Sequence, residues 1–410
     1  MPTINSLHAR EILDSRGLPT VEVHLGTEDG IFVASVPSGA SVGTKEALEL
    51  RDGDARFNGK GVLKAATYVN GEIRNTLLGK SFDQKTLDNT LITLDGTENK
   101  SRLGANAILG VSVAFARAAA AEQKIPLYRY FAKEFGANSV SLPVPSFNIV
   151  NGGKHADSGL SIQEFMIVPM EGTRTQRIEQ AALVIQTLRQ ALKKNGYAIS
   201  LGDEGGFAPT LKANEEALDM LVSSIRESGY DENKIKIAID VAATSFYENK
   251  AYRVSGDSVL TQDEMIEWYQ SLIKKYPIFS IEDPFEENDW DSFAKLRAAT
   301  KDAVLVVGDD LLTTNENRIK ESITKQSTSA VIIKPNQVGT ITETFAAARL
   351  AREHGIKLFA SHRSGETTDT FIVDLAVGLG SEYLKAGSLA RGERVAKYNR
   401  LMEIEGELSQ

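Results

Sequence analysis

The segment AVLVVGDD, residues 303–310, decides the fold. A short apolar run ends directly on Asp309 and Asp310, a pattern typical of a buried strand that presents polar side chains at its carboxyl end. Five other segments in the C-terminal two-thirds of the chain repeat this pattern. They are IKIAID (235–240), IFSIED (278–283), AVIIKPN (330–336), KLFASHRS (357–364) and YLKAGS (383–388).

The polar residues at the ends of these runs recur at intervals that range from 42 positions (Asp240 to Glu282) down to 23 positions (His362 to Lys385). A (β/α)₈ barrel uses about 250 residues for eight strand–helix units, and its functional groups lie at the carboxyl ends of the strands. The sequence therefore predicts an α/β barrel whose rim carries acids and lysines.

Two earlier segments, VPSFNIV (144–150) and QEFMIVP (163–169), read as the first strands of this barrel. Only a loop separates them, so we expect them to pair antiparallel. The alternation continues through a helix at 173–195, the segment AISLGDEGG (198–206) and a helix at 212–228.

The N-terminal part has a different order. VEVHL (21–25) and IFVASV (31–36) flank an Asp-Gly pair, which predicts a hairpin. Helical patterns follow at 61–78 and 105–123, so strands precede helices as in a compact α+β domain. Two prolines in LPVPS (142–146) mark the boundary. We expect an N-terminal α+β domain over residues 1–135 and a barrel domain over residues 142–410.

Composition narrows the class of protein. The 410 residues are 42% hydrophobic and 25% charged, as in a soluble globular protein, and the net charge of −9 argues against nucleic acid as a main partner. The chain has no cysteine for disulfides or thiolate metal sites. We also expect no secretory signal and no membrane span, which makes the cytoplasm the simplest compartment.

Three strand-end acids, Asp240, Glu282 and Asp309, are hard oxygen donors. Without cysteine or clustered histidine they favour Mg²⁺ or Mn²⁺ over zinc or copper. The alternative is that such acids only cap the helices that follow the strands.

Lys334 directly follows an apolar run, and Pro335 favours an extended backbone at that point. Near divalent cations and a second lysine, Lys385, its pKa should fall, which makes it a candidate general base. The alternative is a lysine solvated at a strand end.

Two acids upstream are candidates for a proton donor. Glu204 lies among three glycines in GDEGG, which allow a tight loop and a close approach to a ligand. Glu164 begins the QEFMIVP strand, and two neighbouring carboxylates can shift the pKa of one of them upward. An ordinary acidic turn would look the same.

His362, Arg363 and Ser364 form a compact anion-recognition group, because arginine binds phosphate with paired hydrogen bonds. The Gly- and Ser-rich loop around Ser41 is predicted to be a lid, and His155 in NGGKH to be a substrate contact. Each segment could instead be an exposed polar loop.

Taken together, these segments resemble the enolase family over essentially the whole chain. The matching motifs are DSRG, PSGAS, KEALELRDGD, LDGTENKS, GANAILGVS, NGGKHA, QEFMIVP, GDEGGFAP, SIEDPF, GDD, SHRSGET and RVAKYNRL. The resemblance implies a barrel of the β₂α₂(βα)₆ kind with a smaller N-terminal α+β domain. It further implies Mg²⁺-dependent dehydration of 2-phosphoglycerate to phosphoenolpyruvate in glycolysis, by a homodimer or an octamer.

The resemblance also assigns roles to residues. It implies a first Mg²⁺ held by three carboxylates and a second reached by Ser41. It implies that Lys334 removes the C2 proton and that Glu204, assisted by Glu164, protonates the departing C3 hydroxyl. The implied metal ligands are Asp240, Glu282, Asp309 and Ser41, and the implied substrate contacts are His155, Gln163, His362, Arg363, Ser364 and Lys385.

The sequence allows two alternatives. A sugar-acid racemase or dehydratase of the same superfamily commonly carries a K-x-K pair on the second barrel strand, where this chain has Gln163, Glu164 and Phe165. A non-enzymatic binding or structural role would require the loss of a catalytic group, and all are present. The chain departs from the family pattern at Val42 and Pro335, and neither removes a side chain with an implied role. An additional pool at the cell surface is a further expectation.

Overall fold

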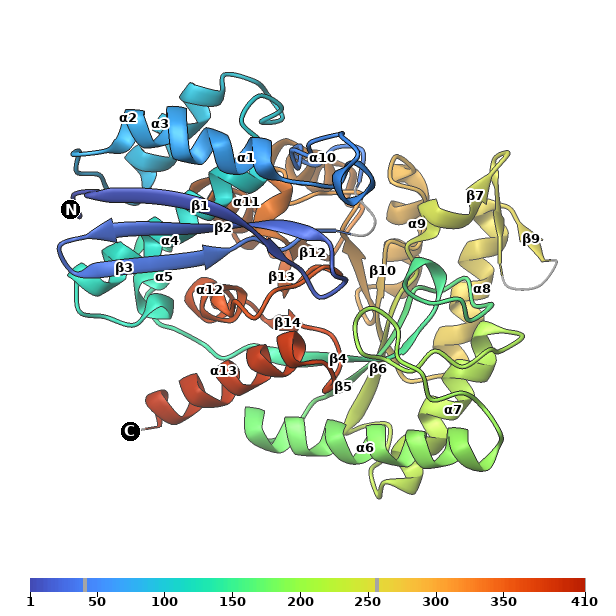
Figure 1. Cartoon of the computed structure of the whole chain (residues 1–410). Coiled ribbons are helices and arrows are strands. Elements are labelled where there is room, and N and C mark those ends of the chain that lie inside the picture. The colour runs from blue at the N-terminus through green and yellow to red at the C-terminus, as the bar shows by residue number, and fades with distance from the viewer. Residues whose placement is uncertain (40–42, 255–257, 410) are drawn as a thin grey trace.

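A closed eight-stranded barrel forms the larger part of the molecule (Figure 1). The computed structural model describes residues 1–39, 43–254 and 258–409. Around the barrel the strands follow in sequence order, and the last strand closes onto the first. The strands are β4 (Val144–Asn151), β5 (Glu164–Pro169), β6 (Ile235–Asp240), β10 (Ile278–Glu282), β11 (Leu305–Gly308), β12 (Ala330–Ile333), β13 (Lys357–Ser361) and β14 (Tyr383–Lys385).

Strand β5 runs antiparallel to both of its neighbours, whereas the other barrel pairings are parallel. The antiparallel start predicted from the short connection is therefore confirmed. Two helices follow β5, and six strand–helix units complete the β₂α₂(βα)₆ order. The barrel helices are α6 (Arg174–Lys194), α7 (Asn214–Glu227), α8 (Gln262–Lys275), α9 (Trp290–Thr300), α10 (Glu316–Lys325), α11 (Ile341–Glu353), α12 (Phe371–Leu379) and α13 (Gly392–Leu408).

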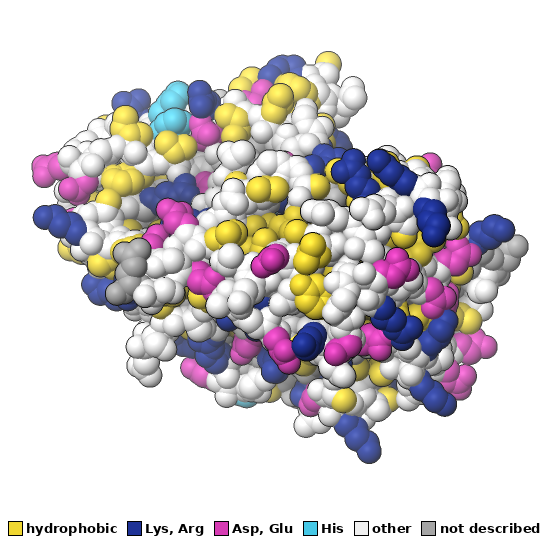
Figure 2. Space-filling model, turned by 90° about the horizontal axis from the view of Figure 1, so that it is seen from below, with side chains coloured by type: hydrophobic (Ala, Val, Ile, Leu, Met, Phe, Trp, Pro, Cys, Tyr) yellow, Lys and Arg dark blue, Asp and Glu magenta, His cyan; other side chains and the backbone are white. Residues whose placement is uncertain are grey.

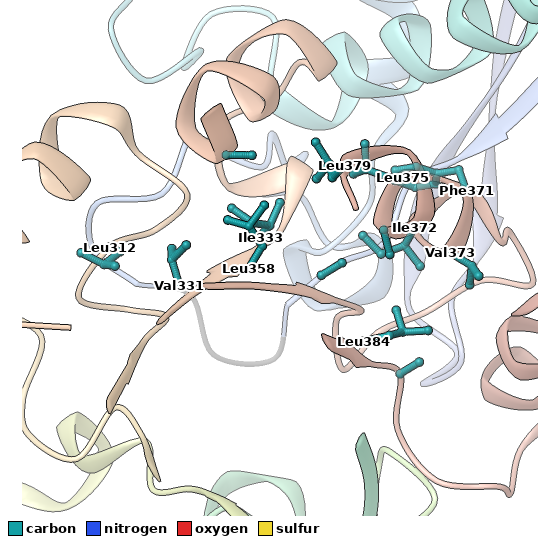
Figure 3. Close-up of a cluster of buried hydrophobic side chains, with 14 of the residues drawn as sticks. Leu312, Val331, Ile333, Leu358, Phe371, Ile372, Val373, Leu375, Leu379 and Leu384 are labelled. Atoms are coloured by element: carbon teal, nitrogen blue, oxygen red, sulfur yellow. The ribbon is translucent and has the colours of Figure 1, made fainter. Parts of the chain in front are cut away.

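Alternating side chains of the barrel strands pack on two sides. On β12, Ala330 and Ile332 belong to a small apolar cluster with Phe359 and Tyr383. The intervening residues of the strands belong to the large core shared with the helices. This alternation follows from the two-residue period of a strand. Figure 3 shows these residues together with those of α12 and a neighbouring loop: Leu312, Val331, Ile333, Leu358, Phe371, Ile372, Val373, Leu375, Leu379 and Leu384.

The N-terminal part is an antiparallel three-stranded sheet covered by helices. The predicted hairpin is confirmed as the β2–β3 pair, and the predicted helix at 105–123 is the almost wholly buried α4. The predicted helix at 61–78 contains a π-helical turn at Val69–Ile73. Strand β1 and helices α3 and α5 were not predicted. The elements are β1 (Ser6–Leu13), β2 (Pro19–Thr27), β3 (Gly30–Ser35), α1 (Leu63–Tyr68), α2 (Arg74–Leu77), α3 (Gln84–Asp95), α4 (Ala105–Glu122) and α5 (Leu127–Phe135).

Two segments differ from the simple alternation. AISLGDEGG (198–206) adds no barrel strand and makes only an isolated bridge, between Leu201 and Phe207. The long interval after Asp240 is accounted for by a small sheet of β7 (Tyr247–Glu248), β8 (Ala251–Arg253) and β9 (Val259–Leu260). This sheet protrudes on the right in Figure 1.

The two parts of the molecule meet along α3, α4 and α5 on one side and α11 and α12 on the other (Figure 1). Ion pairs cross this contact: Arg117 binds Asp369 at 2.6 Å and Lys100 binds Glu343 at 2.5 Å. The N-terminal part therefore packs firmly on the barrel.

Figure 2 views the molecule from below the orientation of Figure 1, where α6 and α7 lie lowest. Basic and acidic side chains are mixed on this face, with apolar side chains between them. None of the helices in the described ranges is long and apolar enough to cross a membrane.

Candidate active site

The carboxyl ends of the barrel strands bring most of the predicted residues to one cavity. Asp240 and Glu282 end neighbouring strands and are paired in register, and Lys385 ends β14. Glu164 begins the antiparallel β5, which places it beside Asp240 at the same end of the barrel. The predicted residues that line the cavity are His155, Gln163, Glu164, Glu204, Asp240, Asp309, Lys334, His362, Arg363, Ser364 and Lys385.

Two predicted residues are not among this lining. The carboxylate of Glu282 is buried and is bound by Lys385 Nζ at 2.9 and 3.0 Å. Ser41 lies outside the described residues, so its predicted role at a second metal ion stays a prediction.

Lys385 stands at the centre of a carboxylate cluster. Its Nζ lies 2.8 Å from Asp240 Oδ2 and 3.2 Å from Glu164 Oε1, in addition to Glu282. Burial opposes the ammonium charge, but these carboxylates raise the pKa of Lys385 well above its ordinary value. Burial and the neighbouring Asp240 charge raise the pKa of Glu282 to about 8. The single positive charge of Lys385 thus does not balance the three carboxylates that surround it.

Lys334 follows β12, which lies opposite β5 in the closed barrel. Its Nζ contacts Asp309 Oδ2, and Asp309 Oδ1 accepts a hydrogen bond from Gln337 Nε2 at 2.9 Å. Burial disfavours the charge, but the Asp309 carboxylate raises the pKa of Lys334. Without a bound cation, Lys334 is therefore an ammonium. The lower pKa that we expect for Lys334 beside two cations stays a prediction.

Glu164 and Glu204 form a pair around His155, whose Nδ1 is 3.7 Å from Oε1 of each. Burial and the Glu204 charge raise the pKa of Glu164 well above its ordinary value. Burial acts in the same sense on Glu204, but His362 and His155 outweigh it and hold its pKa well below the ordinary value. A proton shared by this pair therefore resides on Glu164.

The loop after β13 carries the predicted anion-binding group. Arg363 donates from Nη1 to Glu46 Oε2 at 2.8 Å and from Nη2 to Glu46 Oε1 at 3.1 Å. Nη1 also donates to Asn336 Oδ1 at 2.9 Å. A carboxylate from the N-terminal part thus fixes the orientation of a guanidinium that faces the cavity with Ser364.

The donor set fits a hard divalent cation, because it consists of buried carboxylates. The structure divides the predicted ligands between two lysines: Asp240 and Glu282 bind Lys385, whereas Asp309 binds Lys334. In the described part of the chain, two groups have ligand atoms that all lie within 4.8 Å of one another. They are Asp283 with Asp309 and Asp310, and His155 with Glu164 and Glu204.

Asp283 also has a structural role that the sequence indicated only as a doubled acid. Its carboxylate accepts hydrogen bonds from the backbone N–H groups of Asp309 at 2.9 Å and Asp310 at 2.7 Å. Its φ of 41° lies in the left-handed region, which is uncommon outside glycine. Asp283 therefore connects the ends of β10 and β11 at the site.

Sequence reasoning missed Glu46, Asn336, Gln337 and Arg394. Arg394 is fully buried and donates to His362 and to the carbonyl oxygens of Arg363 and Ser364. Glu46 and Arg394 stand in the quoted motifs KEALELRDGD and RVAKYNRL, but nothing local indicates the role of any of the four, because each acts through a partner distant in the sequence; Glu46 and Arg363 are 317 positions apart.

Comparisons with known proteins agree with this geometry. The family model "Enolase, N-terminal domain" matches residues 4–131, and "Enolase, C-terminal TIM barrel domain" matches residues 139–410. Curated proteins named "Enolase" from Campylobacter jejuni subsp. jejuni serotype O:23/36 (strain 81-176) and serotype O:6 (strain 81116 / NCTC 11828) are each 50% identical over 410 residues. The match covers 99% of this chain and 98% of each relative. The protein named "Enolase" from Campylobacter jejuni (strain RM1221) shows the same identity and coverage.

Proposed function

The chain belongs to the enolase family, and from that premise we propose how its barrel mouth interconverts 2-phosphoglycerate and phosphoenolpyruvate. The protein is a phosphopyruvate hydratase, a carbon–oxygen lyase of glycolysis. The observation that carries the assignment of roles is the strand order: Lys334 follows β12, which lies opposite β5 in the eight-stranded barrel, where Glu164 begins, and both residues line the cavity.

Asp240, Glu282 and Asp309 would hold a first Mg²⁺, and Ser41 would reach a second. When bound, the two ions supply positive charge beside the substrate carboxylate. The surplus of buried carboxylate at this end of the barrel supports this assignment, because a divalent cation would neutralise it.

Lys334 would be the base that takes the proton from C2. Its side chain is partly buried and lines the cavity, and its position is fixed by Asp309 and by the end of β12. To act as a base it must release its own proton first. The paired carboxylate must therefore be engaged elsewhere before the reaction, for example by a cation.

Glu204 would give a proton to the C3 hydroxyl, because hydroxide is a poor leaving group and departs as water once protonated. The raised pKa of Glu164 supports the assisting role proposed for it. Glu164 would hold the proton in the resting pair and make it available to Glu204.

The remaining cavity residues would bind substrate. Arg363 and Ser364 would hold the phosphate, since a guanidinium and a hydroxyl both donate to phosphate oxygens. The other contacts would come from His155, Gln163, His362 and Lys385.

The test of this function is direct. The purified protein with 2-phosphoglycerate and Mg²⁺ should generate the ultraviolet absorbance of an enol phosphate, and EDTA should abolish it. Restoring Mg²⁺ in excess should restore the rate. A protein that binds Mg²⁺ fully and shows no turnover would contradict the assignment.

Three broader proposals accompany the mechanism. The domain limits would be residues 1–135 and 142–410, which the two family matches support.

The protein would be a homo-oligomer, a dimer or an octamer, and light scattering of the purified protein would distinguish the two. It would work in the cytoplasm, with an additional pool at the cell surface, and fractionation of cells with an antibody would test both locations.

A further inference from the structure

Arg394 lies in the first turn of α13, and its side chain is fully buried. Nη1 lies 2.6 Å from His362 Nδ1 and donates to the carbonyl oxygen of Arg363 at 2.6 Å. Nη2 donates to the carbonyl oxygens of Ser364 at 2.5 Å and Asp203 at 3.3 Å. One guanidinium thus connects the loop of His362, Arg363 and Ser364 to the loop that carries Glu204.

These contacts determine where the proton of His362 lies. A guanidinium stays charged and only donates hydrogen bonds, so His362 Nδ1 must accept, and the ring proton must be on Nε2. Burial lowers the pKa of His362 to about 3, and the charges of Arg394 and Lys385 act in the same sense against that of Glu204. The ring is therefore neutral at working pH, with a defined tautomer.

The Nε2 of His362 faces Glu204 Oε2 at 3.3 Å. The same oxygen accepts a hydrogen bond from Asn148 Nδ2 at 3.0 Å. Asn148 therefore directs an N–H group at Oε2, and the protonated Nε2 of His362 lies 3.3 Å from the same oxygen, so a proton on Oε2 would oppose both. The other oxygen, Oε1, lies 3.7 Å from His155 Nδ1, on the side shared with Glu164.

We propose that Arg394 is a positioning residue that holds His362 as an Nε2–H donor to Glu204 Oε2, so that the proton held by Glu164 in the resting pair reaches the substrate through Glu204 Oε1. In the elimination the Oε1–H bond breaks, the proton joins the C3 oxygen, and the C3–O bond breaks to release water. The second half of this inference rests on the acid role proposed for Glu204, whereas the tautomer of His362 does not.

The tautomer can be measured on the unaltered protein by NMR with ¹⁵N-labelled histidine. The chain has only five histidines, and substitutions of His8, His24 and His354 by Gln assign the signals outside the site. His362 should show an unprotonated Nδ1 and a protonated Nε2, unchanged between pH 5.5 and pH 8.5. A protonated Nδ1, or titration within that range, would overturn the proposal even in an active enzyme.

The kinetic half is tested by Arg394→Met, with Arg394→Lys as the conservative variant, since lysine can still donate to Nδ1. The Met variant should lose the fixed tautomer and dehydrate at least tenfold more slowly, with C2 proton exchange changed less than twofold. The Lys variant should recover both properties in part.

Lys397→Met is the matched control. Lys397 is equally buried on the same helix but donates to Glu366 Oε2 at 2.9 Å and not to His362. This variant should keep the tautomer. If Arg394→Met retained the tautomer, or if exchange and dehydration fell together in it, the positioning role would be refuted. If Arg394→Met did not fold, the measurement on the unaltered protein would still decide the tautomer.

Discussion

Glu46 illustrates how one carboxylate can prepare a binding site for an anion. It binds both terminal nitrogens of Arg363 and also accepts a hydrogen bond from the Gly43 N–H at 3.0 Å. Paired charge-assisted hydrogen bonds of this kind fix the orientation of the guanidinium and also stabilise the pair. Arg363 is therefore held in place before a phosphate arrives, by a residue that would not itself contact the substrate.

Substituting Glu46 by Gln should weaken substrate binding more than it slows the reaction. The amide keeps the shape but loses the charge and one of the two hydrogen bonds accepted from Arg363. We expect KM for 2-phosphoglycerate to rise about tenfold, which corresponds to about 1.4 kcal/mol, with kcat changed less than about threefold.

Glu49→Gln is the control, because Glu49 binds Arg51 and Ser38 in the same segment. Steady-state kinetics of both variants give the answer. If Glu46 does not need to orient Arg363, KM in Glu46→Gln will stay unchanged or fall, because the substitution removes a negative charge near the phosphate site. Either result would contradict the prediction.

At this scale the sequence predicted the residues that directly follow strands. Asp240, Lys334 and Lys385 could be found because chain position fixes their place on the rim. Glu46 and Arg394 could not, because burial against distant partners gives them their roles. The sequence also could not tell which of Glu164 and Glu204 has the raised pKa, since His362 decides it.

The sequence predicted best the strands and helices that repeat in the barrel. Apolar runs with polar ends identified the barrel strands, and the short β4–β5 connection identified the antiparallel pair. The predicted alternation was wrong at 198–206, where the glycines that present Glu204 leave a loop. Helices α3 and α5 were missed although α5 is strongly amphipathic, with Tyr128, Phe131 and Phe135 buried; it spans only nine residues.

Asp88 links two elements across the domain contact and makes their association depend on pH. It lies on α3, is fully buried, and accepts hydrogen bonds from Thr342 N and Oγ1 at the start of α11, at 2.9 and 2.6 Å. Burial raises its pKa to about 6, against about 3.9 in an unfolded chain. The folded state therefore binds this proton more tightly, and lowering the pH from 7 towards 4 stabilises the fold through Asp88.

Asp88→Asn should remove this dependence. At pH 8 we expect the variant to be more stable than the unaltered protein by about 2 kcal/mol, with the difference vanishing near pH 4. Urea unfolding at several pH values measures it.

Asp83→Asn is a control of opposite sign. Hydrogen bonds from Thr86 lower the pKa of Asp83, so the contribution of Asp83 to the free energy of unfolding is lost as the pH falls. A pH-independent difference between Asp88→Asn and the unaltered protein would contradict the account of Asp88.

For the whole molecule, the contact between the two parts is what completes the site. The barrel supplies the catalytic groups, and the N-terminal part supplies Glu46. Further along the contact, Asp369 receives hydrogen bonds from both terminal nitrogens of Arg117, at 2.9 and 2.6 Å, and from Ser35 N at 3.0 Å. The sequence predicted two domains but gave no sign of these connections, whose partners are hundreds of positions apart.

Asp369→Asn should loosen this contact. Removing one member of this partly buried pair leaves Arg117 uncompensated, and we expect the free energy of unfolding to fall by about 2 kcal/mol. Hydrogen exchange of the Ser35 amide should accelerate.

Asp374→Asn serves as control, since Asp374 binds Arg400 within the barrel domain. It should leave exchange at Ser35 unchanged. Equal exchange rates at Ser35 in the two variants would show that Asp369 does not hold the domains together.

The central claim is that Lys334 and Glu204 act on different atoms of one substrate from different sides of the cavity. The most direct measurement is exchange of the C2 proton of 2-phosphoglycerate with solvent, recorded beside the rate of dehydration. Lys334→Ala should abolish exchange, whereas Glu204→Gln should retain exchange while dehydration stops. Equal loss of exchange in both variants would contradict this division of roles.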